Sequence, residues 1–320
     1  MPIGIAAILA APRLLQETAP HAGRLELTGA LSSTLGVSAL VYGIVHSAAA
    51  GWTDPVTLGA LLAGLVLVGV FVSDQRRSPQ PIMPLRLFAD RQRAGAYAAR
   101  FLFNGALLSF FFFMTQYLQG VRGATPLQAG SLFLPVTAAA SAAATATPRL
   151  VRRCGNPPLV VAGCAAMLIG TAWISRLSAS TGYLTGLLAP MIIFGIGQGL
   201  GLSTLTTAGM AGVDTRDAGV AGGLVNVSHH TGGALGLGLL ITIFAAAGRG
   251  ARQALLADRV SAALTGAAVL LALALLVTLI THPGRRRAAI ADPAPGARLP
   301  TAQSRAHRGP EAFTESRAAA

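Results

Sequence analysis

The chain has 320 residues, of which 53% are hydrophobic and only 11% are charged, and its formal net charge at pH 7 is +13. A typical soluble domain carries about 25% charged residues, so this composition excludes a soluble enzyme or binding protein. The hydrophobic residues fall in blocks of about 20, the length that crosses a hydrocarbon layer of about 30 Å as an α-helix. The sequence therefore predicts an all-α integral membrane protein, with the lipid bilayer as its surroundings.

The first apolar stretch, residues 1–15, is too short to cross a bilayer, because 15 residues at a rise of 1.5 Å each reach only about 22 Å. It also lacks the basic start of a signal peptide, since its only charge, Arg13, comes near its end. We interpret it as the end of a transmembrane helix that begins upstream.

Eight full-length apolar blocks follow, separated by short segments rich in Gly, Pro or Arg, such as Arg149–Pro157. The predicted spans are Leu27–Ala48, Pro55–Ser73, Gly95–Gln119, Ala129–Thr147, Pro158–Leu177, Tyr183–Gly209, Val220–Ala247 and Val260–Thr281. The last span ends before Pro283, which cannot continue a helix. Residues 284–320 are rich in Pro, Ala, Arg and Ser without apolar periodicity, which predicts a disordered tail.

All 24 basic residues are arginines, and they lie between the apolar blocks, where they orient helices rather than bind nucleic acid. If the first stretch ends in the cytoplasm and the spans alternate, fourteen arginines lie inside and five outside, which predicts a cytoplasmic C-terminus. The inside set is Arg13, Arg24, Arg76, Arg77, Arg86, Arg91, Arg93, Arg149, Arg152, Arg153, Arg216, Arg285, Arg286 and Arg287; the outside set is Arg122, Arg176, Arg249, Arg252 and Arg259.

Several segments resemble the fourteen-helix drug–proton antiporter branch of the major facilitator superfamily. Tyr117–Gly130, followed by Pro135, is similar to that family's ninth helix end and the turn into its tenth helix. Gly219–Asn226, followed by His229–Gly236, is similar to its thirteenth helix. Gly51-Trp52 and Pro84–Phe88 resemble the linker pair and the loop after it, so the resemblance covers about residues 1–282.

The resemblance implies a domain organisation and a function. Residues 1–15 would be the end of a truncated sixth helix, 27–73 a linker pair of helices, 95–281 the six-helix C-terminal domain, and 284–320 a cytoplasmic tail. The function would be proton-coupled efflux of drugs or small amphipathic molecules across a bacterial inner membrane. The family's N-terminal half would lie upstream, through an internal start or a broken gene. The alternative is a non-transporting remnant, or a helical partner of a separately encoded N-terminal half.

Polar residues inside the spans are the candidates for a substrate cavity, because burying them in a membrane is costly. They are Arg100, Asn104, Gln198, Asn226, His229 and His230. Arg100 has an alternative role, in which it snorkels to the nearby cytoplasmic surface. The two histidines stand where the family tends to have Arg-Gln. They either sense protonation near neutral pH or stay neutral and bond to a neighbouring helix.

Catalytic and metal sites are not expected. All eleven carboxylates fall outside the apolar blocks or at their margins, so neither a buried proton carrier nor a catalytic acid is present among them. Cys154 and Cys164 form no CxxC pair, and no nucleotide-binding glycine motif occurs, so the sequence predicts no enzyme, metal or cofactor.

Small and aromatic residues complete the pattern. Glycines spaced by four predict close helix packing, with flexing during transport as a second role; they are Gly195, Gly197, Gly199, Gly201, Gly232 and Gly236. Trp52, Trp173, Tyr117 and Tyr183 are predicted near the outer membrane interface as aromatic anchors.

Overall fold

The computed structural model describes residues 26–78, 81–178, 180–247 and 252–281, and every regular element within these ranges is helical. Eight helical spans in this part of the chain are long and apolar enough to cross a membrane. The all-α fold and the number of predicted spans are therefore confirmed. The predicted partial helix 1–15 and the predicted tail 284–320 lie outside the described residues.

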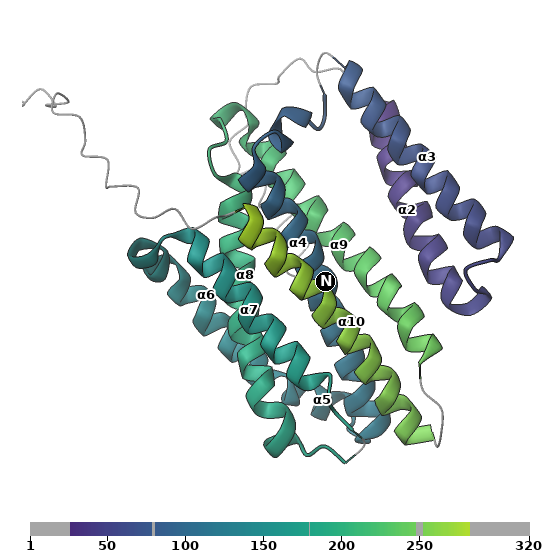
Figure 1. Ribbon diagram of the computed structural model, residues 1–320, viewed down its shortest axis with the longest axis vertical. Coiled ribbons are helices and arrows are strands. Elements are labelled where there is room, and N and C mark those ends of the chain that lie inside the picture. The colour runs from purple at the N-terminus through teal and green to yellow at the C-terminus, as the bar shows by residue number, and fades with distance from the viewer. Residues whose placement is uncertain (1–25, 79–80, 179, 248–251, 282–320) are drawn as a thin grey trace, which may run out of the picture. The chain divides into compact units, whose positions relative to one another are not determined.

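The first two helices, α2 (Leu27–Ala50) and α3 (Pro55–Arg77), run side by side and are drawn in purple and blue in Figure 1. Glycines keep them close, because a side chain on Gly36 or Gly64 would collide with the facing helix. Asp54 caps α3, where its carboxylate accepts hydrogen bonds of 3.0 Å from the amides of Val56 and Thr57. The Thr57 amide is the main cause that holds the pKa of Asp54 below its usual value.

Helix α4 (Arg91–Gln116) packs against three other helices of the bundle. These are α8 (Leu188–Met210), α9 (Ala218–Ala246) and α10 (Arg252–Thr281). Helix α9 also contacts α2, where Gly238 faces Ile44. This arrangement makes α4 the helix through which α8, α9 and α10 are held together.

Helix α8 lies between α6 (Leu134–Cys154) and α7 (Asn156–Ile174), as Figure 1 also shows. The short helix α5 (Pro126–Leu132) precedes α6 and is capped by Thr125 and Gln128, which bond reciprocally to each other's amides. The predicted separator Arg149–Pro157 is wrong, because α6 continues through Pro148 to Cys154 and only Gly155 separates it from α7. Pro157 is tolerated in the first turn of α7, where its missing amide proton has no partner to lose.

The interior of the bundle is filled by aromatic side chains of α4. Phe110 stacks on Phe194 of α8 with ring centroids 3.7 Å apart, and Phe113 stacks on Phe244 of α9 at 5.3 Å. Both α4 rings are fully buried, whereas Phe112 points outward and is 38% exposed. These ring contacts fix how α4, α8 and α9 face one another.

Two wide helical turns extend the spans at one end of the bundle. The first, η2 (Tyr117–Val121), continues α4, and the second, η3 (Tyr183–Leu187), precedes α8. Tyr117 was expected at the outer interface, but its ring is fully buried and its hydroxyl donates to the carbonyl of Ser178 at 2.7 Å. A tyrosine at a span end therefore anchors a loop here rather than the lipid boundary.

At the other end of the bundle, two short 3-10 turns are joined by an ion pair. Arg86 of η1 (Leu85–Phe88) donates to both carboxylate oxygens of Asp217 in η4 (Thr215–Asp217), at 2.8 and 2.9 Å. The pair links the segment before α4 to the start of α9. Arg86 is 64% exposed, so solvent screens the interaction strongly.

Candidate substrate site

Arg100 is the only charged side chain among the buried residues that the structure describes, with 8% of its surface exposed. It lies in α4, and its Nη1 donates to the carbonyl of Leu202 at 2.7 Å and to the hydroxyl of Thr206 at 2.6 Å, both in α8. Its Nε is buried and has no hydrogen-bond partner. Within the described ranges no carboxylate forms an ion pair with Arg100. The guanidinium is thus held by uncharged oxygens and retains an unused donor.

Asn104 lies one turn after Arg100 on the same face of α4. Its Nδ2 donates to the backbone carbonyl of His229 in α9, at 2.5 Å. A side chain on Gly233 would collide with this amide, so the glycine leaves room for the bond. Arg100 and Asn104 therefore connect one face of α4 to α8 and to α9, respectively.

The histidine pair lies in the middle of α9, with ring centroids 5.0 Å apart and rings almost perpendicular. His229 is partly buried, and its Nδ1 has no hydrogen-bond partner, whereas His230 is exposed. The described residues contain no group of three or more His, Cys, Asp or Glu side chains that could hold a metal ion. The pair thus offers proton-accepting nitrogens beside Asn104 rather than a metal centre.

Gln198 and Asn226 extend the site along two helices. Gln198 lies one turn before Leu202 on the same side of α8, and its Oε1 is buried without a hydrogen-bond partner. Asn226 lies one turn before His230 on α9 and is exposed. The structure thus joins Arg100, Asn104 and His229 by direct contacts, and it places Gln198 and Asn226 on adjoining helix faces without a bond to that group.

The predicted packing glycines lie at helix crossings. Side chains on Gly195 and Gly199 would meet the α6 backbone at Val136 and Ala140, and a side chain on Gly197 would meet α7 at Met167. Gly201 faces the ring of Phe103 in α4. Gly232 and Gly236 of α9 lie against the α4 backbone at Phe101 and Gly105. The two sides of α8 that carry glycines are therefore both covered by other helices.

Sequence reasoning missed two partners of the site. Thr206, which receives the Arg100 hydrogen bond, looks like many other threonines and lies 106 residues away in the chain. The Arg86–Asp217 pair spans 131 residues. The only sequence signal for Thr206 is its spacing of eight from Gln198, which puts both on one face of α8.

Eight apolar helical spans with polar side chains gathered between α4, α8 and α9 define a polytopic α-helical membrane protein. The chain matches the family model described as Major Facilitator Superfamily over residues 3–237, and it belongs to that family.

Three relatives illustrate the similarity. The puromycin resistance protein of Streptomyces alboniger is 33% identical over 82% of this chain and 53% of its own length. The cephamycin export protein CmcT of Amycolatopsis lactamdurans is 32% identical over 88% of this chain and 59% of its own length. The lincomycin resistance protein of Streptomyces lincolnensis is 31% identical over 82% and 54%, respectively. The chain thus spans little more than half the length of these curated relatives.

Proposed function

We propose that this chain is part of a proton-coupled exporter of drugs or other small amphipathic molecules in a bacterial inner membrane. Residues 27–73 would form a helix pair that precedes a six-helix transport domain, 95–281. Membership of the major facilitator superfamily supports transport, and the printed names of the relatives, which refer to resistance and export, favour efflux.

The observation that carries the proposal is the buried Arg100 with its unused Nε. A charged group inside a membrane span is costly and marks a substrate or ion pathway more often than a purely structural contact. Arg100, Asn104, Gln198, Asn226, His229 and His230 would line one wall of the transport cavity. A second six-helix half, encoded in the same gene or in another, would form the opposite wall.

Proton coupling would rest on the histidine pair. The described carboxylates lie at helix ends, in loops or near the start of α10, so His229 and His230 are the titratable groups at membrane depth that are able to exchange a proton near neutral pH. A substrate that contacts Arg100 would lie next to this pair, which would let proton binding and substrate binding influence each other.

The orientation would place the C-terminus in the cytoplasm. Six spans separate Arg86 from Thr281, an even number, so both ends of that region would lie on one side of the membrane. The excess of arginines in the loops on that side favours the cytoplasm.

The test is an efflux assay in bacterial cells that lack their major drug exporters. Cells that express the 320-residue chain are loaded with a fluorescent amphipathic dye, and dye loss is followed with and without an uncoupler of the proton gradient. We expect loss that stops with the uncoupler and with Arg100→Gln, but not with Arg91→Gln on the exposed first turn of α4. Growth in the presence of puromycin and lincomycin provides a second readout.

A second candidate function is a non-transporting partner subunit or remnant, which the length relative to the exporters favours. Co-expression with the N-terminal half of the puromycin resistance protein separates the two candidates. Efflux that appears only in the co-expressing cells supports a partner subunit. Membrane insertion without efflux in either strain would refute the transport proposal.

A further inference from the structure

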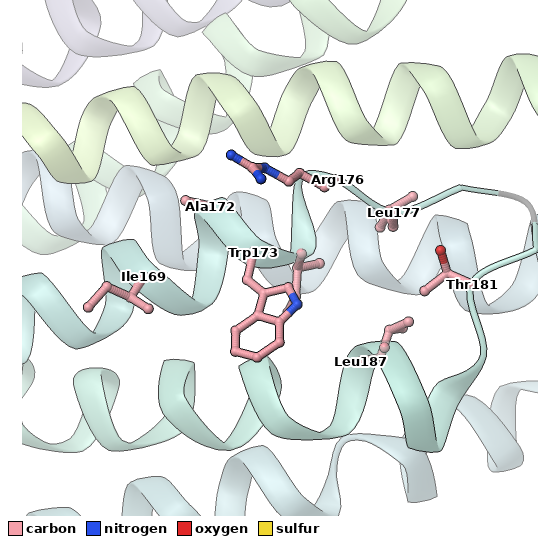
Figure 2. A pocket seen from close by; sticks show the side chains of 9 residues that line it. Ile169, Ala172, Trp173, Arg176, Leu177, Thr181 and Leu187 are labelled. Carbon is pink, nitrogen blue, oxygen red and sulfur yellow. The ribbon is translucent and has the colours of Figure 1, made fainter.

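A pocket with a volume of about 490 Å³ opens beside the C-terminal end of α7, outside the candidate substrate site (Figure 2). Most of its lining is apolar and includes Ile169, Trp173, Leu177 and Leu187. Arg176 is the only charged residue that lines it. The pocket therefore offers an oily floor with one positive charge.

Its place in the fold puts this pocket at a membrane–water boundary. Trp173 lies in the last turn of α7, and Leu187 ends the wide turn that leads into α8, so the pocket lies where two spans end. The Trp173 side chain is 51% exposed, and Arg176 is exposed one turn further along. An indole and a guanidinium at this depth face lipid headgroups, while Ile169, one turn deeper, faces the acyl chains.

The wall of the pocket is held in place by hydrogen bonds from three other parts of the chain. The Tyr117 hydroxyl and the Ser261 hydroxyl donate to the carbonyls of Ser178 and Ser175, respectively. The Ser178 amide donates to the Thr181 hydroxyl at 2.8 Å. The loop after α7 is thus fixed before any ligand arrives, and a preformed pocket binds at lower entropic cost.

The charge of the pocket selects among amphipathic occupants. Arg176 forms no ion pair with a carboxylate in the described ranges, including Asp258 on the adjacent helix α10. Figure 2 shows its guanidinium extending away from the loop, above the backbone of α7, with the Trp173 ring on the other side. A phosphate suits this cation, whereas no acidic residue lines the pocket to receive an ammonium headgroup.

We propose that this pocket binds an anionic phospholipid, with its phosphate at Arg176 and an acyl chain against Trp173 and Ile169. The inference is independent of what the protein transports. It predicts a preference for phosphatidylglycerol over phosphatidylcholine that depends on Arg176.

The chain offers a direct probe, because it has only two tryptophans, Trp52 and Trp173. In the full chain with Trp52→Phe, all indole fluorescence comes from Trp173. The purified protein in detergent is titrated with phosphatidylglycerol or phosphatidylcholine that carry identical brominated acyl chains, which quench a neighbouring indole. We expect half-maximal quenching at an about fivefold lower mole fraction of phosphatidylglycerol, the size expected for one arginine near an anionic lipid surface.

Three comparisons assign that preference to the pocket. In the Trp52→Phe background, Arg176→Gln should make the two titrations coincide, Arg176→Lys should keep most of the preference, and Arg122→Gln, a control on the same predicted membrane side, should leave it intact. If Arg176→Gln does not fold, high salt serves instead, because it should remove the preference while phosphatidylcholine still quenches. Equal titrations before any change at Arg176, or a preference that survives Arg176→Gln, would overturn the proposal.

Discussion

Gly105 of α4 and Gly236 of α9 touch backbone to backbone, so that a Cβ atom on Gly236 would lie 2.5 Å from the Cα of Gly105. The contact lies one turn from the Asn104–His229 hydrogen bond, and it lets the polar groups of the two helices meet. In membranes, where apolar side chains gain little from leaving lipid, such close approach is a main source of helix association.

Gly236→Ala should therefore separate α4 from α9 and destabilise the protein. We expect a loss of about 1–3 kcal/mol, the usual cost of overpacking, visible as a lower melting temperature in detergent. Gly222→Ala in the same helix is the matched control, because nothing lies within 4 Å of its added methyl group. That control should be neutral or stabilising by up to about 1 kcal/mol. Equal melting temperatures for the two variants would show that the crossing contributes little.

Arg100→Met should separate the role of this residue in stability from its role in transport. Methionine removes the buried charge, and the Leu202 carbonyl keeps the hydroxyl of Thr206 as a donor at 2.7 Å. Replacing buried charges by apolar residues is often neutral or stabilising, so the melting temperature should stay or rise. Transport should be lost. A variant that melts several degrees lower would instead mark Arg100 as a structural residue.

The two native cysteines report orientation without any substitution. Cys154 is exposed at the end of α6, whereas Cys164 is buried inside α7. A membrane-impermeant maleimide should label a single thiol per chain, and only in inside-out vesicles, because Cys154 lies on the predicted cytoplasmic side with Arg152 and Arg153. Labelling in right-side-out vesicles would reverse the proposed topology. Cys154→Ser should abolish the signal and confirms the assignment.

Asp54 predicts a pH dependence. Its pKa in the folded protein lies below the ordinary value of 3.8, mainly through the Thr57 amide, with further contributions from Val56 and His46. A carboxyl group with a lowered pKa stabilises the fold above its unfolded-state pKa, and this contribution disappears as the pH falls through the folded-state pKa. Asp54→Ala should lower the melting temperature at pH 7, and the difference from the wild-type protein should shrink below about pH 4. A difference that stays constant down to about pH 3 would contradict this role.

The number of spans could be predicted from the sequence because block length alone determines it, but the helix ends were less predictable. Pro148 and Pro157 suggested a long loop, although one lies inside α6 and the other in the first turn of α7. A proline inside a span is tolerated because neighbouring groups satisfy the freed carbonyl, which a single sequence does not reveal.

The candidate site was predictable only within one helix at a time. The spacing of four between Arg100 and Asn104 places both on one face of α4. Their acceptors are a threonine and two backbone carbonyls more than 100 residues away, and no residue type signals a carbonyl. The role of the six polar residues in transport stays a prediction.

The hydrogen bonds of Arg100 also constrain how the protein is made. Leu202 follows Arg100 by 102 residues, which at about 5–20 residues per second leaves α4 without its α8 acceptors for roughly 5–20 seconds of synthesis. Releasing an isolated arginine into lipid costs about 2.5–3.5 kcal/mol on the translocon insertion scale. Helix α4 is therefore best retained at the insertion machinery until α8 emerges, and the ribosome's pace sets the time at which the two helices meet.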